Sequence, residues 1–520
     1  MIVVWWIKRD LRLSDNPALT AAVARAAELR SVLVPLWVEE PAMISAADTG
    51  QHHRRMLASA LRGLRGELQR RGSDVIILSA DLPRGFEALH RRWGIAEVHA
   101  EEEIGLQWSY DRDRAVRQWG WDRGVPVVEH PRDGVVRRLA DRGSRMKLWK
   151  GRMAENVLAI PRVPALPAEF TREVEQAWRT YESAQDGESG ALQRCDGTAA
   201  RRTLNSFLSH RGREYRSGIS SPYRSRHTGS RLSVHLAWGT LSLREVLRAL
   251  EARRAELQRE RDAAEGVARR ELGGWIRSLS AFESRLHWHD HFIQRLEEEP
   301  EMEHRPLNRA FEDLHYDGEA RFFQAWWEGR TGMPMVDAAM RSLHRTGFVN
   351  FRMRAMVVSA ACHVLHLDWR TIRDPLARIM ADYLPGIHVS QLQMQAGVVG
   401  INTVRVYNPA KQLIDNDPDC RFVHRFIPEL RNFDCATVRA WTLATGGSAS
   451  SIATERRRNG QMELFGDLQA LGDYPRPLVD YRAASAEMKR QLYALKGSSY
   501  GRREAERVLS RHGSRRRRGR

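Results

Sequence analysis

The chain has 520 residues, of which 42% are hydrophobic and 28% charged, and its net charge is +18 at pH 7. This length exceeds one ordinary hydrophobic core, so two or more domains are expected, and the composition excludes an intrinsically disordered chain. No apolar run is long enough to cross a bilayer. The N-terminal run Ile2–Ile7 is followed at once by charged residues, which predicts a buried strand and no signal peptide. We therefore expect a cytoplasmic protein without membrane contact, most simply a monomer.

The strongly basic charge predicts a polyanionic partner, although an arginine-rich composition alone is the plain alternative. Gly501–Arg520 holds nine Arg and two Glu, so the rest of the chain still carries +11. Ser514–Arg520 is predicted to be a disordered, solvated tail that adds non-specific DNA affinity. The four cysteines form no CxxC pair, which predicts free thiols and neither a zinc nor an iron–sulfur site. They are Cys195, Cys362, Cys420 and Cys435.

Short apolar runs alternate with amphipathic segments such as His52–Arg71 through the first 130 residues. The runs are Ile2–Ile7, Ser31–Val38, Asp74–Ala80, Ala96–Glu101 and Val125–His130. This alternation predicts an α/β fold with a doubly wound parallel sheet. No GxGxxG motif follows the first strand, so the usual dinucleotide fingerprint is missing.

The composition changes after the predicted sheet. Pro161–Pro167 and Ser183–Gly197 predict a linker that passes over the surface, and helical periodicity then dominates from Thr198 to Tyr481. Ser242 and Glu245 have capping-box spacing, which indicates a helix start. Two further helices are predicted over Asp337–Leu343 and Arg352–Leu367, the second of them central. The predicted domains are residues 1–132 (α/β domain), 133–197 (linker), 198–485 (helical domain) and 486–520 (basic C-terminal helix and tail).

Five segments carry the most specific motifs of the chain. They are Trp6–Leu19 (WIKRDLRLSDNPAL), Thr228–Ser242 (TGSRLSVHLAWGTLS), Glu328–Met356, Tyr407–Leu430 and Tyr474–Tyr481. Together, and in this order, they resemble the DNA photolyase/cryptochrome family. The first resembles its opening strand and turn, the second its flavin-phosphate loop and the third its central flavin-binding helices. The resemblance implies an α/β antenna domain followed by a large helical domain that binds FAD.

The family's flavin site is carried over residue by residue. Hydroxyl and N–H groups at a helix start suit the FAD diphosphate, and a plain N-cap is the alternative. Arg354 and Asp382 are expected to form an ion pair beside the isoalloxazine ring, unless they are an ordinary structural pair. His388 replaces the family's usual Asn at the N5 edge and can donate a hydrogen bond or a proton there, unless it is a satisfied core histidine. The expected cofactor-binding residues are Tyr215, Thr228, Gly229, Ser230, Arg231, Leu232, Ser233, Arg285, His289, Phe351, Arg354, Asp382, Leu384 and His388.

The lesion pocket of the family departs from its usual pattern here. Trp288 corresponds to one of the two Trp walls, whereas Met394 replaces the other and stacks less strongly than indole. Arg285 stands where an acidic residue is usual, with Glu283 nearby. We expect Trp288, Met394 and His388 to be the catalytic residues. Trp288 and Arg405 are expected to contact DNA, and Arg421 and Arg425 are further candidates for phosphate contacts.

The family's electron relay is also altered. Trp369 matches its middle member and Tyr316 lies near the outer position, but Leu392 replaces the inner Trp and cannot be oxidised. Photoreduction is therefore expected to use other rings, with packing in the core as the alternative role for each. The candidates are Trp326, Trp327, Tyr383 and Tyr407.

The function favoured by these residues is light-driven repair of cyclobutane pyrimidine dimers by a deoxyribodipyrimidine photolyase, a carbon–carbon lyase. The paired histidines of (6-4) photolyases are absent, since Asn350-Phe351-Arg352 stands there. Two alternatives stay open: a cryptochrome-like photoreceptor without repair activity, and a photolyase for (6-4) lesions or single-stranded DNA. A folate, a deazaflavin, a second flavin or no antenna pigment can occupy the N-terminal domain. The acidic run Glu101–Glu103 follows the fourth strand, where such sheets bind ligands, with a solvated loop as the alternative.

Overall fold

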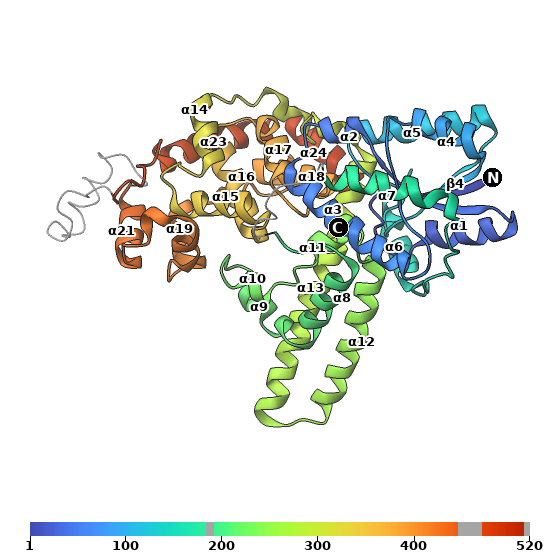
Figure 1. Cartoon of the computed structure of the whole chain (residues 1–520). Coiled ribbons are helices and arrows are strands. Elements are labelled where there is room, and N and C mark those ends of the chain that lie inside the picture. Colours follow the sequence, from blue (N-terminus) through green and yellow to red (C-terminus); the bar gives the residue numbers. More distant parts are fainter. Residues whose placement is uncertain (184–191, 446–470, 514–520) are drawn as a thin grey trace, which may run out of the picture. The chain divides into compact units, whose positions relative to one another are not determined.

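The computed structural model describes residues 1–183, 192–445 and 471–513 (Figure 1). The predicted tail Ser514–Arg520 and most of the stretch Ser183–Gly197 lie outside these residues. The chain forms two compact units, each assembled from three segments. Unit 1 comprises Met1–Arg216, Ser230–Glu303 and Ala377–His388, and unit 2 comprises Ser217–Gly229, His304–Leu376 and Val389–Arg520. The domain boundaries drawn from the sequence stay a prediction.

Unit 1 contains a five-stranded parallel sheet with the strand order β3-β2-β1-β4-β5. The strands are β1 (Ile2–Ile7), β2 (Val32–Glu39), β3 (Ile76–Ser79), β4 (Ile95–Glu101) and β5 (Val127–His130). The helices between them are α1 (Pro17–Glu28), α2 (Pro41–Ser45), α3 (Gln51–Gln69), α4 (Arg84–Trp93) and α5 (Gln107–Arg123). Every residue of β1 is buried, as expected for a central strand covered by helices on both faces. The predicted doubly wound α/β fold is confirmed.

The segment predicted as a surface linker contains two helices, α6 (Arg145–Ala154) and α7 (Ala168–Ser183). Phe170, Val174 and Trp178 recur at helical spacing along α7 and are buried in the core of unit 1. Trp178 Nε1 donates to the carbonyl of Val75 at 2.8 Å. This apolar stripe makes the segment a packed part of unit 1, and the sequence interpretation overlooked it.

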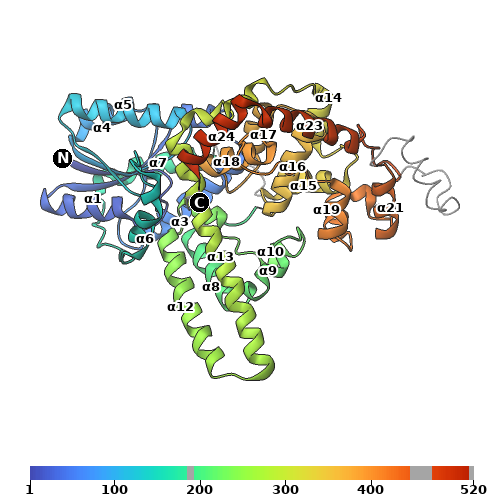
Figure 2. The same ribbon diagram turned by 180° about the vertical axis from the view of Figure 1, so that it is seen from behind.

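The helical part of unit 1 is dominated by an antiparallel pair, α12 (Leu243–Asp262) and α13 (Gly266–Glu298), which lie side by side in Figures 1 and 2. The predicted capping box starts α12: Glu245 N–H donates to Ser242 Oγ, and Ser242 N–H donates to Glu245 Oε2. Shorter helices complete this part of the unit. They are α8 (Gly197–Ser209), α9 (Tyr215–Gly218), which ends in unit 2, and α11 (Ser233–Trp238).

The regular secondary structure of unit 2 is all helical within its described residues. The central helix α16 (Phe351–His363) is buried at Met353 and from Ala355 to His363, and it ends four residues before the predicted Leu367. Its companions are α10 (Ser225–Thr228), α14 (Ala320–Glu328), α15 (Pro334–Thr346), α19 (Pro409–Asn416), α20 (Arg421–Phe426), α21 (Cys435–Thr445), α23 (Tyr481–Gly497) and α24 (Ser499–His512). Two helices, α17 (Trp369–Arg378) and α18 (Pro385–Ala396), run from one unit into the other. Among the described residues, no helix is long and apolar enough to cross a membrane.

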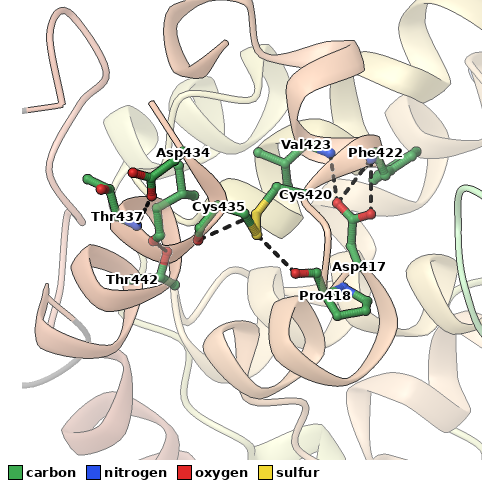
Figure 3. The surroundings of a disulfide bond; sticks show 10 residues. Asp417, Pro418, Cys420, Phe422, Val423, Asp434, Cys435, Thr437 and Thr442 are labelled. Atoms are coloured by element: carbon green, nitrogen blue, oxygen red, sulfur yellow. Dashed lines mark hydrogen bonds between the residues drawn. A yellow bond between two sulfur atoms is a disulfide. The ribbon is translucent and has the colours of Figure 1, made fainter. Parts of the chain in front are cut away.

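A disulfide joins Cys420 and Cys435, so the prediction of four free thiols was wrong (Figure 3). Cys420 stands at the start of α20 and Cys435 at the start of α21, with their Cα atoms 5.5 Å apart. Asp417 fixes the first of these helix starts, because its carboxylate accepts hydrogen bonds from the N–H groups of Phe422 and Val423. The sequence did not reveal the pairing because the two cysteines meet only through the turn between the helices. Cys195 and Cys362 are free and buried.

Removal of this disulfide is expected to destabilise the α20–α21 region by about 3 kcal/mol, because the bridge closes a loop of 15 residues. Hydrogen exchange of the amides in both helices measures the effect in the double variant C420S/C435S. A reductant should loosen the wild-type region to the same extent and leave the double variant unchanged. Equal protection in the wild type and the variant would contradict the expectation.

Candidate functional site

Three predicted site residues of unit 1 share one helix, α13. Arg285, Trp288 and His289 are spaced so that they lie on neighbouring positions of its surface. Arg285 forms a hydrogen bond with the hydroxyl of Tyr215, whose pKa burial raises to about 12. Tyr215 itself packs edge-on against Phe282 of α13. The structure therefore brings Tyr215 and the α13 residues together.

The indole of Trp288 is held on one side and open on the other. It is 37% exposed, a large fraction for a tryptophan, and it stacks on Phe292 at 5.6 Å between ring centroids. His291 contacts its edge at 5.1 Å. Glu283, the acidic residue noted near Arg285, forms an ion pair with Arg254 of α12. Glu283 thus has a structural partner on the neighbouring helix.

His289 is positioned by a buried carboxylate. Its Nδ1–H donates to Asp290 Oδ1 at 2.8 Å, whereas its Nε2 is buried without a hydrogen-bond partner. In the neutral imidazole, this bond leaves Nε2 as an acceptor. A buried acceptor of this kind suits a ligand that carries hydroxyl groups, such as the ribityl chain of a flavin.

The predicted diphosphate loop divides between the two units. Thr228 and Gly229 belong to unit 2, whereas Ser230, Arg231, Leu232 and Ser233 belong to unit 1. Arg231 adopts a positive φ of 60°, which marks a tight turn ahead of α11. Thr228 Oγ1 donates to the carbonyl of Arg224 at 3.1 Å, so its lone pairs remain available as acceptors only. The joint binding of a diphosphate by the loop stays a prediction.

The segment Ala377–His388 of unit 1 carries Asp382, Leu384 and His388. His53 of α3 fixes its start, with Nε2 3.0 Å from the carbonyls of both Ala377 and Met380. The N–H of Gly50 donates to His53 Nδ1, which assigns the proton of the neutral ring to Nε2.

Tyr383 in the same segment stacks on the His53 ring at 5.1 Å and donates its hydroxyl to Asp48 at 2.7 Å. The ring of His388 meets Tyr383 edge-on at 5.3 Å. Contacts with α3 and the preceding loop therefore position the segment from which Asp382 is presented.

Two predicted cofactor-binding residues of unit 2, Phe351 and Arg354, lie at the start of α16. Asn350 caps this helix and donates its side-chain N–H groups to the carbonyls of Ile219 and Ser220 at 2.8 and 2.9 Å. Phe351 is 50% exposed, and Arg352 Nε is buried without a hydrogen-bond partner. Arg354 Nε donates to the carbonyl of Val349 at 3.1 Å. An open aromatic ring beside guanidinium groups at a helix N-terminus suits a flat, anionic ligand.

Arg354 and Asp382 lie in different units, so their expected ion pair stays a prediction. Leu392 is 1% exposed and Met394 is half-buried on α18. Gln393 between them is anchored within unit 2: it accepts from the N–H of Leu307 and donates to the carbonyl of Arg305. Arg405 is exposed.

The candidate electron-transfer residues fall into two groups. Trp369 and Tyr316 are joined by no aromatic contact in the described part of the chain. Trp326 and Trp327 have ring centroids 6.5 Å apart, and the ring of His344 meets Trp327 at 4.4 Å. The second group has the close spacing of oxidisable rings that electron hopping requires.

A cluster of arginines in unit 2 was only partly foreseen. Arg226 of α10 lies near Arg425 and Arg345. Burial, and secondarily the charges of these two arginines, lower the pKa of Arg226. The guanidinium groups of Arg226 and Arg425 each lie 5.8 Å from the ring of Phe426, and Arg421 lies 5.2 Å from the ring of Tyr223. The sequence pointed to Arg421 and Arg425. It missed Arg226 and Arg345, because only the folded chain brings α10 and the end of α15 to α20.

The acidic run at the sheet edge is not a solvated loop. Glu101 is buried and pairs with Arg12 at 2.6 Å, and Glu103 pairs with Arg112 at 2.8 Å. Burial raises the pKa of Glu101 to about 8, against the opposing effect of Arg12. Arg12 and Arg112 of unit 1 therefore pair with these two side chains, and the identity of an antenna pigment stays open.

Comparison with known protein families assigns both parts of the chain. Residues 3–140 match the family model described as DNA photolyase, and residues 282–494 match the FAD binding domain of DNA photolyase. The chain belongs to the DNA photolyase/cryptochrome family, and its cofactor is FAD. In unit 1, the buried Nε2 of His289 suits a hydroxyl group of this cofactor. In unit 2, the open ring of Phe351 and the guanidinium groups of Arg352 and Arg354 suit its flat ring system.

The curated relatives match over most of their length. A deoxyribodipyrimidine photo-lyase of Halobacterium salinarum is 25% identical over 92% of this chain and 96% of its own. One of Thermus thermophilus is 29% identical over 82% of this chain and 92% of its own. A cryptochrome DASH of Natronomonas pharaonis is 26% identical over 92% of this chain and 98% of its own.

Solved structures share the fold at lower identity. An archaeal photolyase from Sulfolobus tokodaii, solved with two FAD molecules, has a TM-score of 0.72 at 21% identity and covers 95% of this chain and 100% of its own. A cryptochrome from Synechocystis has the same TM-score at 19% identity, over 94% of this chain and 98% of its own.

His53 is expected to make unit 1 sensitive to acid. Burial, and secondarily Arg9, lower its folded-state pKa to about 3, whereas its pKa in the unfolded chain is about 6.5. The unfolded state therefore binds more protons below pH 6.5, and stability falls as the pH is lowered through that window. At pH 5 the loss from this one residue is about 2 kcal/mol.

Thermal unfolding of the wild type and H53Q between pH 7.5 and 5 tests this expectation. The variant should melt lower at pH 7.5, because it replaces a well-placed ring, but its melting temperature should depend less on pH. Buried His99, His235 and His363, whose pKa values are also lowered, act equally in both proteins. Identical pH dependence in the two proteins would contradict the role of His53.

Proposed function

We propose that the protein is a deoxyribodipyrimidine photolyase, which uses light to split cyclobutane pyrimidine dimers in DNA. The observation that carries the proposal is the geometry of Trp288. Phe292 supports one side of its indole, and 37% of the side chain stays open to solvent. A flat ring held in this way offers a stacking surface to a base that has left the duplex.

Electrostatics support a DNA substrate. Burial, and secondarily the charges of Arg425 and Arg345, lower the pKa of Arg226, and a bound phosphate relieves the repulsion among these cations. The same cluster contains Tyr223 and Phe426 beside the guanidinium groups. Arginines interleaved with aromatic rings are typical of surfaces that follow a nucleic-acid strand. In the proposal, this cluster and Arg405 contact the backbone without reading its sequence.

Within the proposal, bound reduced FAD would supply a light-driven electron to the dimer and would take it back once the ring has split. The chain's own residues bind and orient the two reactants. Trp288 and Met394 hold the dimer, and Arg354, oriented by Asp382, offers a positive charge beside the flavin ring. His388 offers a hydrogen bond or a proton at the N5 edge.

Cyclobutane dimers are favoured over (6-4) lesions by the use of Asn350. Both of its functions are structural: its oxygen accepts from Met353 N–H, and its amino group donates to Ile219 and Ser220. A (6-4) repair reaction needs an acid at this place, and an amide cannot supply a proton.

A cryptochrome-like photoreceptor is the second candidate. The observation that favours it is Leu392, which fills a fully buried position where the family's relay has a Trp. Without that ring, photoreduction depends on rings such as the Trp326–Trp327 pair, and half-buried Met394 binds a dimer less firmly than a second indole.

Blue illumination of the reduced protein with a dimer-containing oligonucleotide tests the proposed function. We expect light-dependent loss of dimers, and the variant W288A should bind the dimer about 5- to 150-fold more weakly, because it loses a stacking contact of about 1–3 kcal/mol. Dimer loss is measured by chromatography, and affinity by titration in the dark.

The variant W121A is the matched control. Trp121 lies on α5 and is 84% exposed, so its removal also deletes a surface indole but should leave dimer binding unchanged. Both variants should keep the flavin absorbance of the wild type. Photoreduction of the flavin without any dimer loss in the wild type would instead establish the photoreceptor.

A further inference from the structure

More than half of the chain's net positive charge lies in its last forty residues. Residues 481–520 hold thirteen Lys and Arg against three Glu, which gives +10 of the total of +18. The described part of this region forms α23 and α24 of unit 2, the two helices coloured red in Figures 1 and 2. Neither helix carries a residue expected to hold the flavin or the lesion, so the proposed function leaves this charge unexplained.

Each of the two helices buries one stripe and exposes the opposite face. Met488 and Leu492 of α23 are buried, as are Val508 and His512 of α24, and both pairs have i, i+4 spacing. The exposed faces carry cations together with two large aromatic side chains. Tyr493 is 49% exposed and Tyr500 44%.

Four cations of these helices have no carboxylate partner within the described residues. Lys496 Nζ donates to the carbonyl of Asn402 and Arg502 Nη1 to that of Gly497, whereas the Arg503 guanidinium lies 5.8 Å from the Tyr500 ring. Lys489 is exposed and forms no ion pair in this part of the chain. The absence of acidic partners leaves a positive potential that attracts polyanions.

The acidic residues of the same helices do not compensate this charge. Glu487 pairs with Arg490, and Glu504 pairs with Arg507 at 3.0 Å. These pairs leave Lys489, Lys496, Arg502 and Arg503 in excess. The remaining glutamate, Glu506, is a single charge against four.

We infer that the exposed faces of α23 and α24 form a second DNA-binding surface, outside the flavin and lesion site, that contacts backbone phosphates without reading sequence. We call it the α23–α24 surface; it comprises Lys489, Tyr493, Lys496, Tyr500, Arg502 and Arg503. Its cations bind phosphates, and its tyrosines can stack on unpaired bases. This surface binds undamaged DNA, which goes beyond the proposed function. The choice of DNA as the partner rests on that proposed function.

The inference is tested with the full chain and the variant K489Q/K496Q/R502Q/R503Q. Fluorescence anisotropy measures binding to an undamaged 30-base-pair duplex between 50 and 200 mM NaCl. We expect at least a tenfold loss of affinity at 50 mM NaCl. The slope of log K against log salt concentration should flatten by about 3 to 4, since each lost phosphate contact contributes about 0.9.

The matched control is R259Q/R269Q/R270Q/R277Q. These four arginines are exposed on α12 and α13 and form no ion pair in the described part of the chain, so the control loses the same charge from another surface. It should keep the wild-type salt slope. An equal loss of affinity in both variants would mean that only the net charge matters, and it would overturn the inference. An unchanged salt slope in K489Q/K496Q/R502Q/R503Q would overturn it as well.

Two further measurements separate this surface from the lesion site. Flavin absorbance and dimer repair at saturating DNA should be unaffected in K489Q/K496Q/R502Q/R503Q, because it alters no residue of the proposed pocket. If the wild type repairs no dimers, the proposed function fails, whereas the comparison on undamaged DNA still decides the inference. The double variant R502Q/R503Q, which spares both lysines, should flatten the slope by about half as much and serves as a second test should the fourfold variant unfold.

Discussion

The buried carboxylate of Asp290 is the interaction on which the geometry of the unit 1 site depends. It is fully buried and accepts hydrogen bonds from the N–H of Gly134, from Trp149 Nε1 and from His289 Nδ1, at 2.7 to 2.9 Å. A buried carboxylate is tolerable only when its lone pairs are used in this way. These bonds tie the middle of α13 to the segment that leaves the parallel sheet.

The rotation of α13 about its axis follows from this attachment. With Asp290 directed inward, Trp288 is left on a more exposed face, and His289 donates through Nδ1 while its Nε2 is buried without a hydrogen-bond partner. Arg285 lies one turn earlier and reaches Tyr215. One satisfied buried charge thus sets the stacking surface, the free acceptor and the cationic group of the site at the same time.

The sequence predicted those features of the structure that depend on a local pattern of residues or on the order of the family's motifs. Every strand was located to within two residues at each end, because apolar runs such as Ile2–Ile7 bury both faces. The capping box of Ser242 and the central position of α16 were likewise local. The Cys420–Cys435 bridge, the packing of α7 and the participation of Arg226 and Arg345 depend on which segments meet in the fold, and no spacing along the chain encodes them.

The site residues illustrate the same limit. The order of the family's motifs along the sequence predicted which residues form the site. Their positions and hydrogen bonds, however, depend on neighbours far away in the chain. His53 is 324 residues from Ala377, and its neutral ring holds the segment that bears Asp382. Nothing near Asp382 in the sequence indicates this dependence.

The distribution of charge separates structural from binding surfaces. At the sheet edge, Glu101 and Glu103 each contact an arginine, so the charged groups there are paired with one another. Around Arg226, and at Lys496, Arg502 and Arg503 of α23 and α24, cations meet aromatic rings or carbonyl groups instead of acids. A protein that needed these arginines only for stability gains nothing from leaving them uncompensated, because their mutual repulsion opposes folding. The unpaired cations are therefore best explained by a polyanion that binds after the chain has folded.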